Sequence, residues 1–149
     1  MSAEPTLTPA QRGDLRTIAA MIIPESAEYR VPGADDAKIQ ADILATLGRD
    51  AKRVAEALDH LARFAGRPLA GLDPERREAV AREFRATGGA AAAALTRVVL
   101  QCYYRDDRVL HSLGLELRPP FPQGYPLEQG DWSLLDPVKT RRSMWRRAK

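Results

Sequence analysis

The sequence predicts an all-α protein: a single compact bundle of about five to six helices, followed by an extended, proline-rich C-terminal segment with aromatic anchors. Three observations predict this. Aliphatic residues recur at helical spacing up to about residue 113, between residues that favour helix ends. Only 6% of the 149 residues are aromatic, so the core must consist mostly of aliphatic side chains, which suit closely packed helices. Beyond residue 117, prolines and glycines interrupt the periodic pattern.

The first helix is predicted to begin after Thr8 and to end before Pro24. Thr8 and Gln11 can form a capping box, and Pro9 suits the first helical position. Pro24 ends the helix because proline lacks the N–H that the next hydrogen bond needs. Residues 24–33 are therefore expected to form a loop.

A second and a third helix follow this loop. Asp35 or Asp36 can cap the second, which stops at Gly48. Asp50 begins the third, which ends at Gly66. In both stretches the aliphatic residues fall on one helical face, and this predicts that the face is buried.

Three further helices complete the predicted bundle. Asp73 followed by Pro74 is a strong start for the fourth helix. The fifth, over about residues 90–104, is apolar around most of its circumference, so we expect it to be the central and most buried one. Asp106 or Asp107 can cap a short sixth helix.

Residues 118–137 differ in character from the helical domain expected over residues 1–117. Five prolines and two glycines in this stretch exclude a regular helix. Large apolar residues are interleaved with them: Phe121, Tyr125, Leu127, Trp132, Leu134 and Leu135. An extended segment with spaced apolar anchors usually binds a surface. We therefore expect residues 118–149 to pack either on the protein's own helices or on a partner chain.

The histidines, the cysteine and the glycine-rich stretch of this chain do not occur in the patterns that catalytic or metal sites require. His60 and His111 have no second ligand at the spacing of a metal site. Cys102 is the only cysteine, has no histidine close in sequence and is interpreted as a buried apolar side chain. The glycines of residues 87–90 lack the lysine of a phosphate-binding loop. We therefore expect no catalytic, cofactor-binding or metal-binding residue in this chain.

The positive charge of the chain is concentrated at its C-terminus. The net charge is +3, but six Lys and Arg residues fall within residues 139–149, and the rest of the chain is slightly acidic. No helix in residues 1–117 carries a basic stripe. The tail, which includes Trp145, has two interpretations: a solvated C-terminus, or a basic helix that contacts nucleic acid or an anionic membrane.

Targeting signals are not evident in the sequence. The first 16 residues hold no apolar stretch of signal-peptide length and no adjacent arginines. No segment approaches the roughly 20 apolar residues that cross a bilayer. We expect a cytoplasmic location and no transmembrane segment, with a periplasmic location only if a partner carries the export signal.

Several short motifs occur in an order that resembles a known family. A first helix ending in Ile22-Ile23-Pro24, followed by Val31-Pro32-Gly33-Ala34, resembles the opening of the gluconate 2-dehydrogenase subunit 3 family. The run Leu-Gln-Cys-Tyr-Tyr-Arg-Asp at 100–106, then Leu113-Gly114 and a proline-rich segment with Gly124-Tyr125, resembles its closing half. The resemblance extends from about residue 8 to about residue 127.

This resemblance implies a non-catalytic small subunit. In that family the small subunit pairs with a large flavoprotein of the glucose-methanol-choline oxidoreductase type, which holds FAD and oxidises a sugar, a sugar acid or another alcohol. Some complexes add a cytochrome subunit. The small subunit helps the large one mature and often carries a twin-arginine export signal, which this sequence lacks. FAD is thus expected in the partner, no cofactor in this chain, and nucleic acid is not expected as a partner.

We predict the surface that contacts the large subunit from the apolar anchors of residues 118–137 and from the run at residues 100–106 that resembles the family. Large aromatic residues dominate the energetics of most protein interfaces. The partner-binding residues that we expect are Tyr103, Tyr104, Phe121, Tyr125, Trp132 and Leu134.

Two other hypotheses belong to different classes of function. The first alternative is a small helical module that binds nucleic acid or an anionic membrane through its basic tail, and it predicts steep salt dependence. The second is a stand-alone enzyme on a helical scaffold that uses Tyr103, Tyr104, Asp106 and His111, and it predicts turnover by the single chain.

Overall fold

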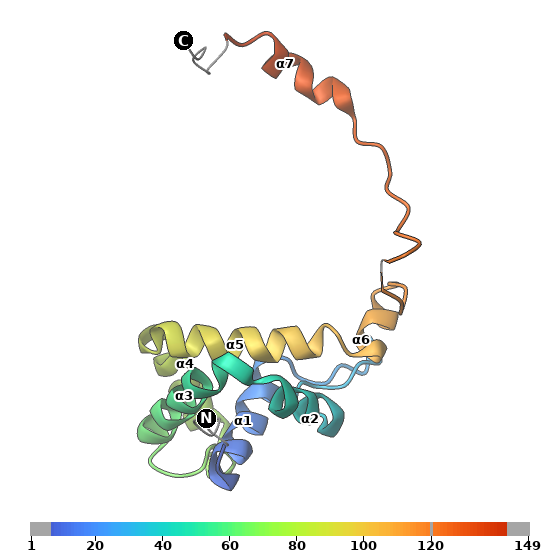
Figure 1. Cartoon of the computed structure of the whole chain (residues 1–149). Coiled ribbons are helices and arrows are strands. Elements are labelled where there is room, and N and C mark those ends of the chain that lie inside the picture. Colours follow the sequence, from blue (N-terminus) through green and yellow to red (C-terminus); the bar gives the residue numbers. More distant parts are fainter. Residues whose placement is uncertain (1–6, 120, 143–149) are drawn as a thin grey trace. The chain divides into compact units, whose positions relative to one another are not determined.

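The computed structural model describes residues 7–119 and 121–142, and within them it is helical without any extended strand. The predicted all-α class is confirmed. The chain divides into two compact units, Met1–Leu117 and Arg118–Lys149, which are described one at a time. In the first unit the helices are α1 (Pro9–Ile22), α2 (Ala37–Thr46), α3 (Ala51–Ala65), α4 (Pro74–Thr87), α5 (Gly89–Tyr103) and α6 (Asp107–Ser112), with short 3₁₀ turns η1 (Gly48–Asp50) and η2 (Leu69–Gly71) (Figure 1).

Four of the predicted helix starts are capped by the residues that the sequence indicates, whereas Asp50 at the start of α3 forms no side-chain cap. The Gln11 N–H donates to the Thr8 hydroxyl and the Thr8 N–H donates to the Gln11 side-chain oxygen, so the capping box at α1 is complete. The carboxylates of Asp36, Asp73 and Asp106 each accept a backbone N–H in the first turn of α2, α4 and α6. These bonds satisfy N–H groups that have no partner within the helix.

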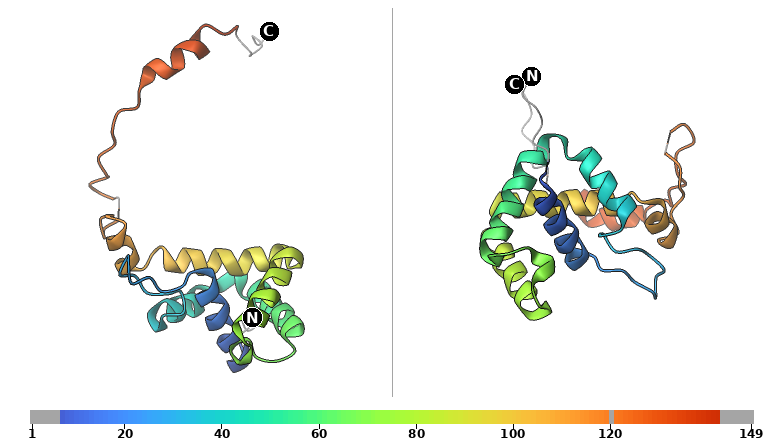
Figure 2. Two further views of the ribbon diagram at one scale, coloured as in Figure 1. Left: turned by 180° about the vertical axis from the view of Figure 1, so that it is seen from behind. Right: turned by 90° about the horizontal axis from the view of Figure 1, so that it is seen from below.

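The helices pack around α3. This helix lies against α1, α4 and α5, and its inward face is fully buried at Val54, Ala57, Leu58 and Leu61. All three views in Figures 1 and 2 place α1 between α2 on one side and the α3–α4 pair on the other. One continuous apolar core results.

The expectation that the helix near residues 90–104 is the central one is wrong in part. Helix α5 lies along one side of the unit (Figure 1), and Ala90, Ala93 and Leu100 remain exposed. The sequence looked apolar all round because α5 is rich in alanine. Alanine has a small apolar surface and is tolerated on either face of a helix, so it is a weak indicator of burial.

Two polar contacts tie the helices together, one buried and one partly exposed. The buried Asp14 carboxylate of α1 accepts the backbone N–H of Leu69, with 2.8 Å between nitrogen and oxygen. At the other end of the unit, Arg108 bonds to Asp36 at the start of α2 and to Asp106 at the start of α6. A single guanidinium therefore fixes two helix starts relative to one another.

The C-terminal unit has little regular structure. Residues 126–130 are irregular, and η3 (Trp132–Leu135) and α7 (Asp136–Lys139) follow as two short helical turns. The prediction that residues 118–137 hold no regular helix is therefore wrong at its end. Pro137 is compatible with α7 because it lies in the first turn, where a helix has no use for the missing N–H.

Candidate partner-binding surfaces

The anchors of the C-terminal unit are displayed rather than buried within that unit. Phe121 is 84% exposed, Leu134 is 74% exposed and Trp132 is 66% exposed. Leu127 is more exposed still. None of the described residues of this unit is buried, because its prolines and short turns do not bring these side chains together.

Local hydrogen bonds hold the anchor Trp132 in place. The Asp131 carboxylate accepts both the hydroxyl and the backbone N–H of Ser133, and these bonds lower the pKa of that carboxyl. The capped turn presents Trp132, whose indole N–H donates to the Gln129 amide oxygen at 3.3 Å. The turn thus fixes the direction of an aromatic side chain that is two-thirds exposed.

Tyr125 differs from the other anchors because it is engaged within its own loop. Its hydroxyl donates to the Arg118 carbonyl oxygen. The Arg118 guanidinium lies 4.7 Å from the centre of the Tyr125 ring, in a cation–π arrangement, and also donates to the Gly124 carbonyl at 2.8 Å. Gly124 has a φ of +66°, which permits the turn that closes this contact. Tyr125 is half-exposed and presents one face of its ring.

Of the two tyrosines predicted on the helical unit, only one is at the surface. Tyr103 is 4% exposed and belongs to the core, where burial raises the pKa of its phenol. Tyr104 is 52% exposed and meets the Tyr103 ring edge-on at 5.2 Å. Tyr103 therefore positions Tyr104 and offers almost no surface to a partner. The exposed Tyr104 ring can contact a partner.

The side chains considered for catalysis are engaged in structural contacts or lie apart. His60 packs on Phe64 at 4.8 Å between ring centres. The Asp106 carboxylate is occupied by Arg108 and by the N-terminus of α6, and these bonds lower its pKa, with Arg108 the main cause. His111 is exposed on α6. Among the described residues, no three His, Cys, Asp or Glu side chains gather as metal ligands would.

Cys102 is buried, as the sequence predicts. Its sulfur lies 3.4 Å from the Thr46 hydroxyl and 3.6 Å from the Arg105 guanidinium. Burial nevertheless raises the pKa of the thiol above its usual value, against the attraction of Arg105. The group is therefore a neutral thiol near neutral pH, which makes it a poor nucleophile.

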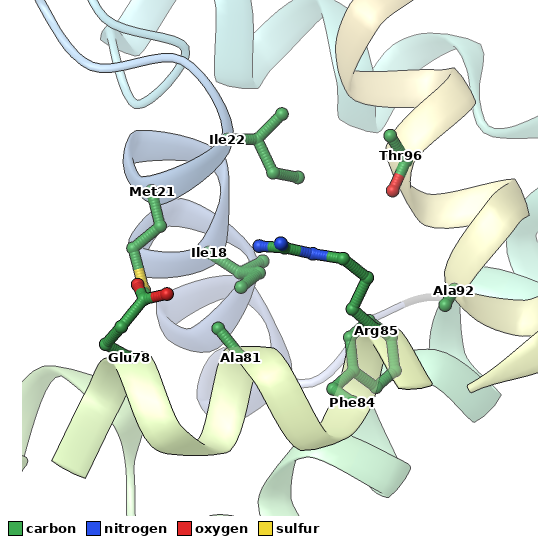
Figure 3. A pocket seen from close by; sticks show the side chains of 9 residues that line it. All are labelled: Ile18, Met21, Ile22, Glu78, Ala81, Phe84, Arg85, Ala92 and Thr96. Carbon is green, nitrogen blue, oxygen red and sulfur yellow. The ribbon is translucent and has the colours of Figure 1, made fainter. Parts of the chain in front are cut away.

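A half-open pocket of about 330 Å³ lies between α1, α4 and α5 (Figure 3). The apolar part of its lining consists of Ile18, Met21, Ile22, Ala81, Phe84 and Ala92. Arg85 extends from α4 with its guanidinium toward Ile18 and Ile22, while Glu78 lies beside Met21 (Figure 3). The sequence analysis did not identify this pocket, because its lining comes from three helices and no single motif marks it.

A cluster of basic residues on the helical unit was also missed. Arg49, Lys52, Arg53 and Arg97 line one shallow depression together with Asp50. The Asp50 carboxylate pairs with Arg97 at 2.7 Å. The side chains that form this cluster come from η1, α3 and α5. A search along single helices does not find a cluster of this kind.

Comparisons with known proteins find no family model that matches this chain, no similar curated protein and no similar solved structure. Each described helix also falls short of the length and apolar character needed to cross a bilayer.

Proposed function

We propose that this chain is a non-catalytic small subunit that binds, and stabilises or matures, a large FAD-dependent sugar or alcohol dehydrogenase. The observation that carries the proposal is the exposure of Phe121, Leu127, Trp132 and Leu134 on a unit in which none of the described residues is buried. Exposed apolar side chains in such a concentration are typical of a surface that a partner covers.

The energetics of these anchors favour a stable complex. Covering one large apolar side chain contributes about 1.5–3 kcal/mol. Three such side chains therefore contribute on the order of 5 kcal/mol or more, which offsets much of the cost of association. Prolines limit the conformations of the free segment and so reduce the entropy lost on binding.

The nature of the partner follows from the family resemblance. The motifs at residues 22–24, 31–34 and 100–106, together with Gly124-Tyr125, resemble those of the gluconate 2-dehydrogenase subunit 3 family. They imply that FAD and the reacting groups belong to the large subunit, with a cytochrome as a further component in some complexes. The structural contacts of His60, Cys102 and Asp106 agree with a helper role for this chain.

The proposal is tested by affinity purification of the tagged full chain from its native host, followed by an absorption spectrum. A yellow complex with flavin bands and one large second chain is the expected result. Trp132→Ala should reduce the flavin that copurifies, whereas Gln123→Ala, a change at an exposed polar side chain of the same unit, should not. A colourless chain recovered alone would overturn the proposal.

A second candidate function rests on the basic tail. Lys139 ends the exposed helix α7 and Arg141 and Arg142 follow it, while the further basic residues Arg146, Arg147 and Lys149 lie outside the described residues. Such a tail is suited to nucleic acid or to an anionic membrane. This alternative predicts binding that weakens steeply with salt and disappears when residues 139–149 are deleted.

A further inference from the structure

The three-helix pocket of Figure 3 continues into a longer groove. The groove starts at the end of α4 and runs along α5, and Arg85, Ala92 and Thr96 line both the pocket and the groove. From Gly89 to Gln101 the groove follows α5 for about 18 Å, because a helix rises 1.5 Å per residue. That length accommodates about three turns of a second helix.

The lining of the groove between its two arginines is mostly apolar, and most of its side chains are small. The residues that form it are Ala86, Gly89, Ala92, Ala93, Thr96 and Leu100. Small side chains let another helix approach closely, so that its larger side chains enter the grooves between them. At one end the pocket of about 330 Å³ provides a place for one large apolar side chain.

The charges along this face are unequal at its two ends. At the end near Gln101 the groove adjoins the basic cluster of Arg49, Lys52, Arg53 and Arg97. Asp50 is the only carboxylate lining that cluster, and Arg97 pairs with it. At the other end Glu78 lies on the rim of the pocket opposite Arg85. An occupant that complements this face has acidic groups at the Arg97 end and none beside Glu78.

The shape of the face favours a polypeptide helix over a nucleic acid. Single-stranded nucleic acids need a continuous cationic track and exposed aromatic rings on which bases stack. The middle of this groove is apolar, its cations lie toward the two ends, at Arg85 and at the Arg97 cluster, and the one aromatic side chain that lines the pocket, Phe84, is buried. A helix with a narrow apolar stripe matches these features.

We propose that the α1–α4–α5 face docks an amphipathic helix of a partner protein, with an apolar side chain in the pocket and acidic residues over Arg49, Arg53 and Arg97. This inference rests on the proposed function, because it assigns part of the contact with the partner subunit to the helical unit. The complex would then have two contacts with the partner: the α1–α4–α5 face and the anchors of residues 118–142.

The probe is a synthetic, fluorescently labelled amphipathic helix of about four turns, or roughly 15 residues at 3.6 per turn. It carries leucines at helical spacing and glutamates near one end. One control peptide replaces the glutamates by lysines, and another replaces the leucines by serines. Titration with the full chain, followed by fluorescence anisotropy, is expected to show saturable micromolar binding of the acidic peptide and at least tenfold weaker binding of both controls.

Two variants of the full chain locate the site. Ala93→Glu places an acid in the groove floor, and the double change Arg49→Glu with Arg53→Glu reverses the basic cluster. Each should weaken binding of the acidic peptide about tenfold or more. Ala62→Glu changes an exposed alanine of α3 that does not line the groove and should leave the affinity within about twofold. Circular dichroism checks that each variant keeps its helical content.

Several outcomes would overturn the inference. The first two concern the peptides: equal affinity of the full chain for the acidic and basic peptides, or no saturable binding of the acidic peptide. The third is an Ala93→Glu variant that binds the acidic peptide as tightly as the unchanged chain. The fourth is tighter binding of a single-stranded oligonucleotide at the same cluster. The two proposals can fail separately. Copurification of flavin without peptide binding overturns the docking site alone. Peptide binding with no flavin-containing partner keeps the docking site and overturns the dehydrogenase assignment.

Discussion

The helical unit and the C-terminal unit use similar residues with opposite results. Both are rich in leucine and contain large apolar side chains. Leu15, Leu58 and Leu95 are fully buried in the first unit, whereas Leu127 and Leu134 are almost bare in the second. The difference lies in spacing, because a helix gathers residues three and four apart on one face. A stretch broken by proline cannot gather its apolar side chains on one face, and they remain exposed within their own unit.

The largest expected effect tests the first half of this comparison. Leu58→Ala removes a side chain that is fully enclosed at the centre of α3, and it should lower the free energy of unfolding by about 2–5 kcal/mol. Urea denaturation followed by circular dichroism measures the change. Leu134→Ala, the same substitution in the C-terminal unit, is the matched control and should alter stability by less than about 0.5 kcal/mol.

If both leucine variants lost stability to a similar extent, the contrast between the units would be wrong. That result would mean that Leu134 is buried in the folded chain.

A smaller effect is expected from the buried hydrogen bond that joins α1 to η2. Asp14→Ala leaves the buried Leu69 N–H without an acceptor and should reduce stability by about 1–3 kcal/mol. Asp14→Asn keeps a side-chain oxygen that can accept this hydrogen bond, so it should lower the free energy of unfolding by less than Asp14→Ala. The same denaturation experiment measures both, and equal losses would show that the carboxylate charge, not the acceptor, is what matters.

The helix starts could be predicted from the sequence because each depends on a few neighbouring residues. Thr8, Asp73 and Asp106 cap the helices that follow them for reasons visible within four positions of the chain. The position of α5 and the burial of Tyr103 could not be predicted in this way, since they depend on which helix faces which. The same limit explains why the pocket and the basic cluster, each built from three elements, had no signature in the sequence.

A third prediction concerns acid stability and the clamp at Arg108. This guanidinium is the main cause of the lowered pKa values of Asp36 and Asp106. A carboxyl whose pKa is lower in the folded state adds stability above its unfolded pKa of about 4, and this stability is lost as the pH falls through the folded value. Arg108→Gln should therefore reduce stability near pH 7 by about 1 kcal/mol, because the group is partly exposed.

The variant's deficit should also shrink as the pH falls below about 4, since both carboxyls become protonated in either protein. Thermal denaturation at a series of pH values measures this. A deficit that stays constant down to the most acidic pH would mean that Arg108 acts through packing rather than charge.

The smallest expected effect on stability belongs to Trp132, and it bears most directly on function. The side chain is two-thirds exposed and its only described hydrogen bond is to Gln129, so Trp132→Ala should change the free energy of unfolding by less than about 0.5 kcal/mol. In the complex, truncation of a central aromatic anchor should cost about 2 kcal/mol or more of binding, a loss of roughly thirtyfold in affinity. Measured together, unchanged unfolding with weakened copurification of the flavoprotein identifies Trp132 as an interface residue. Weakened unfolding with unchanged copurification would instead assign this tryptophan to the protein's own fold.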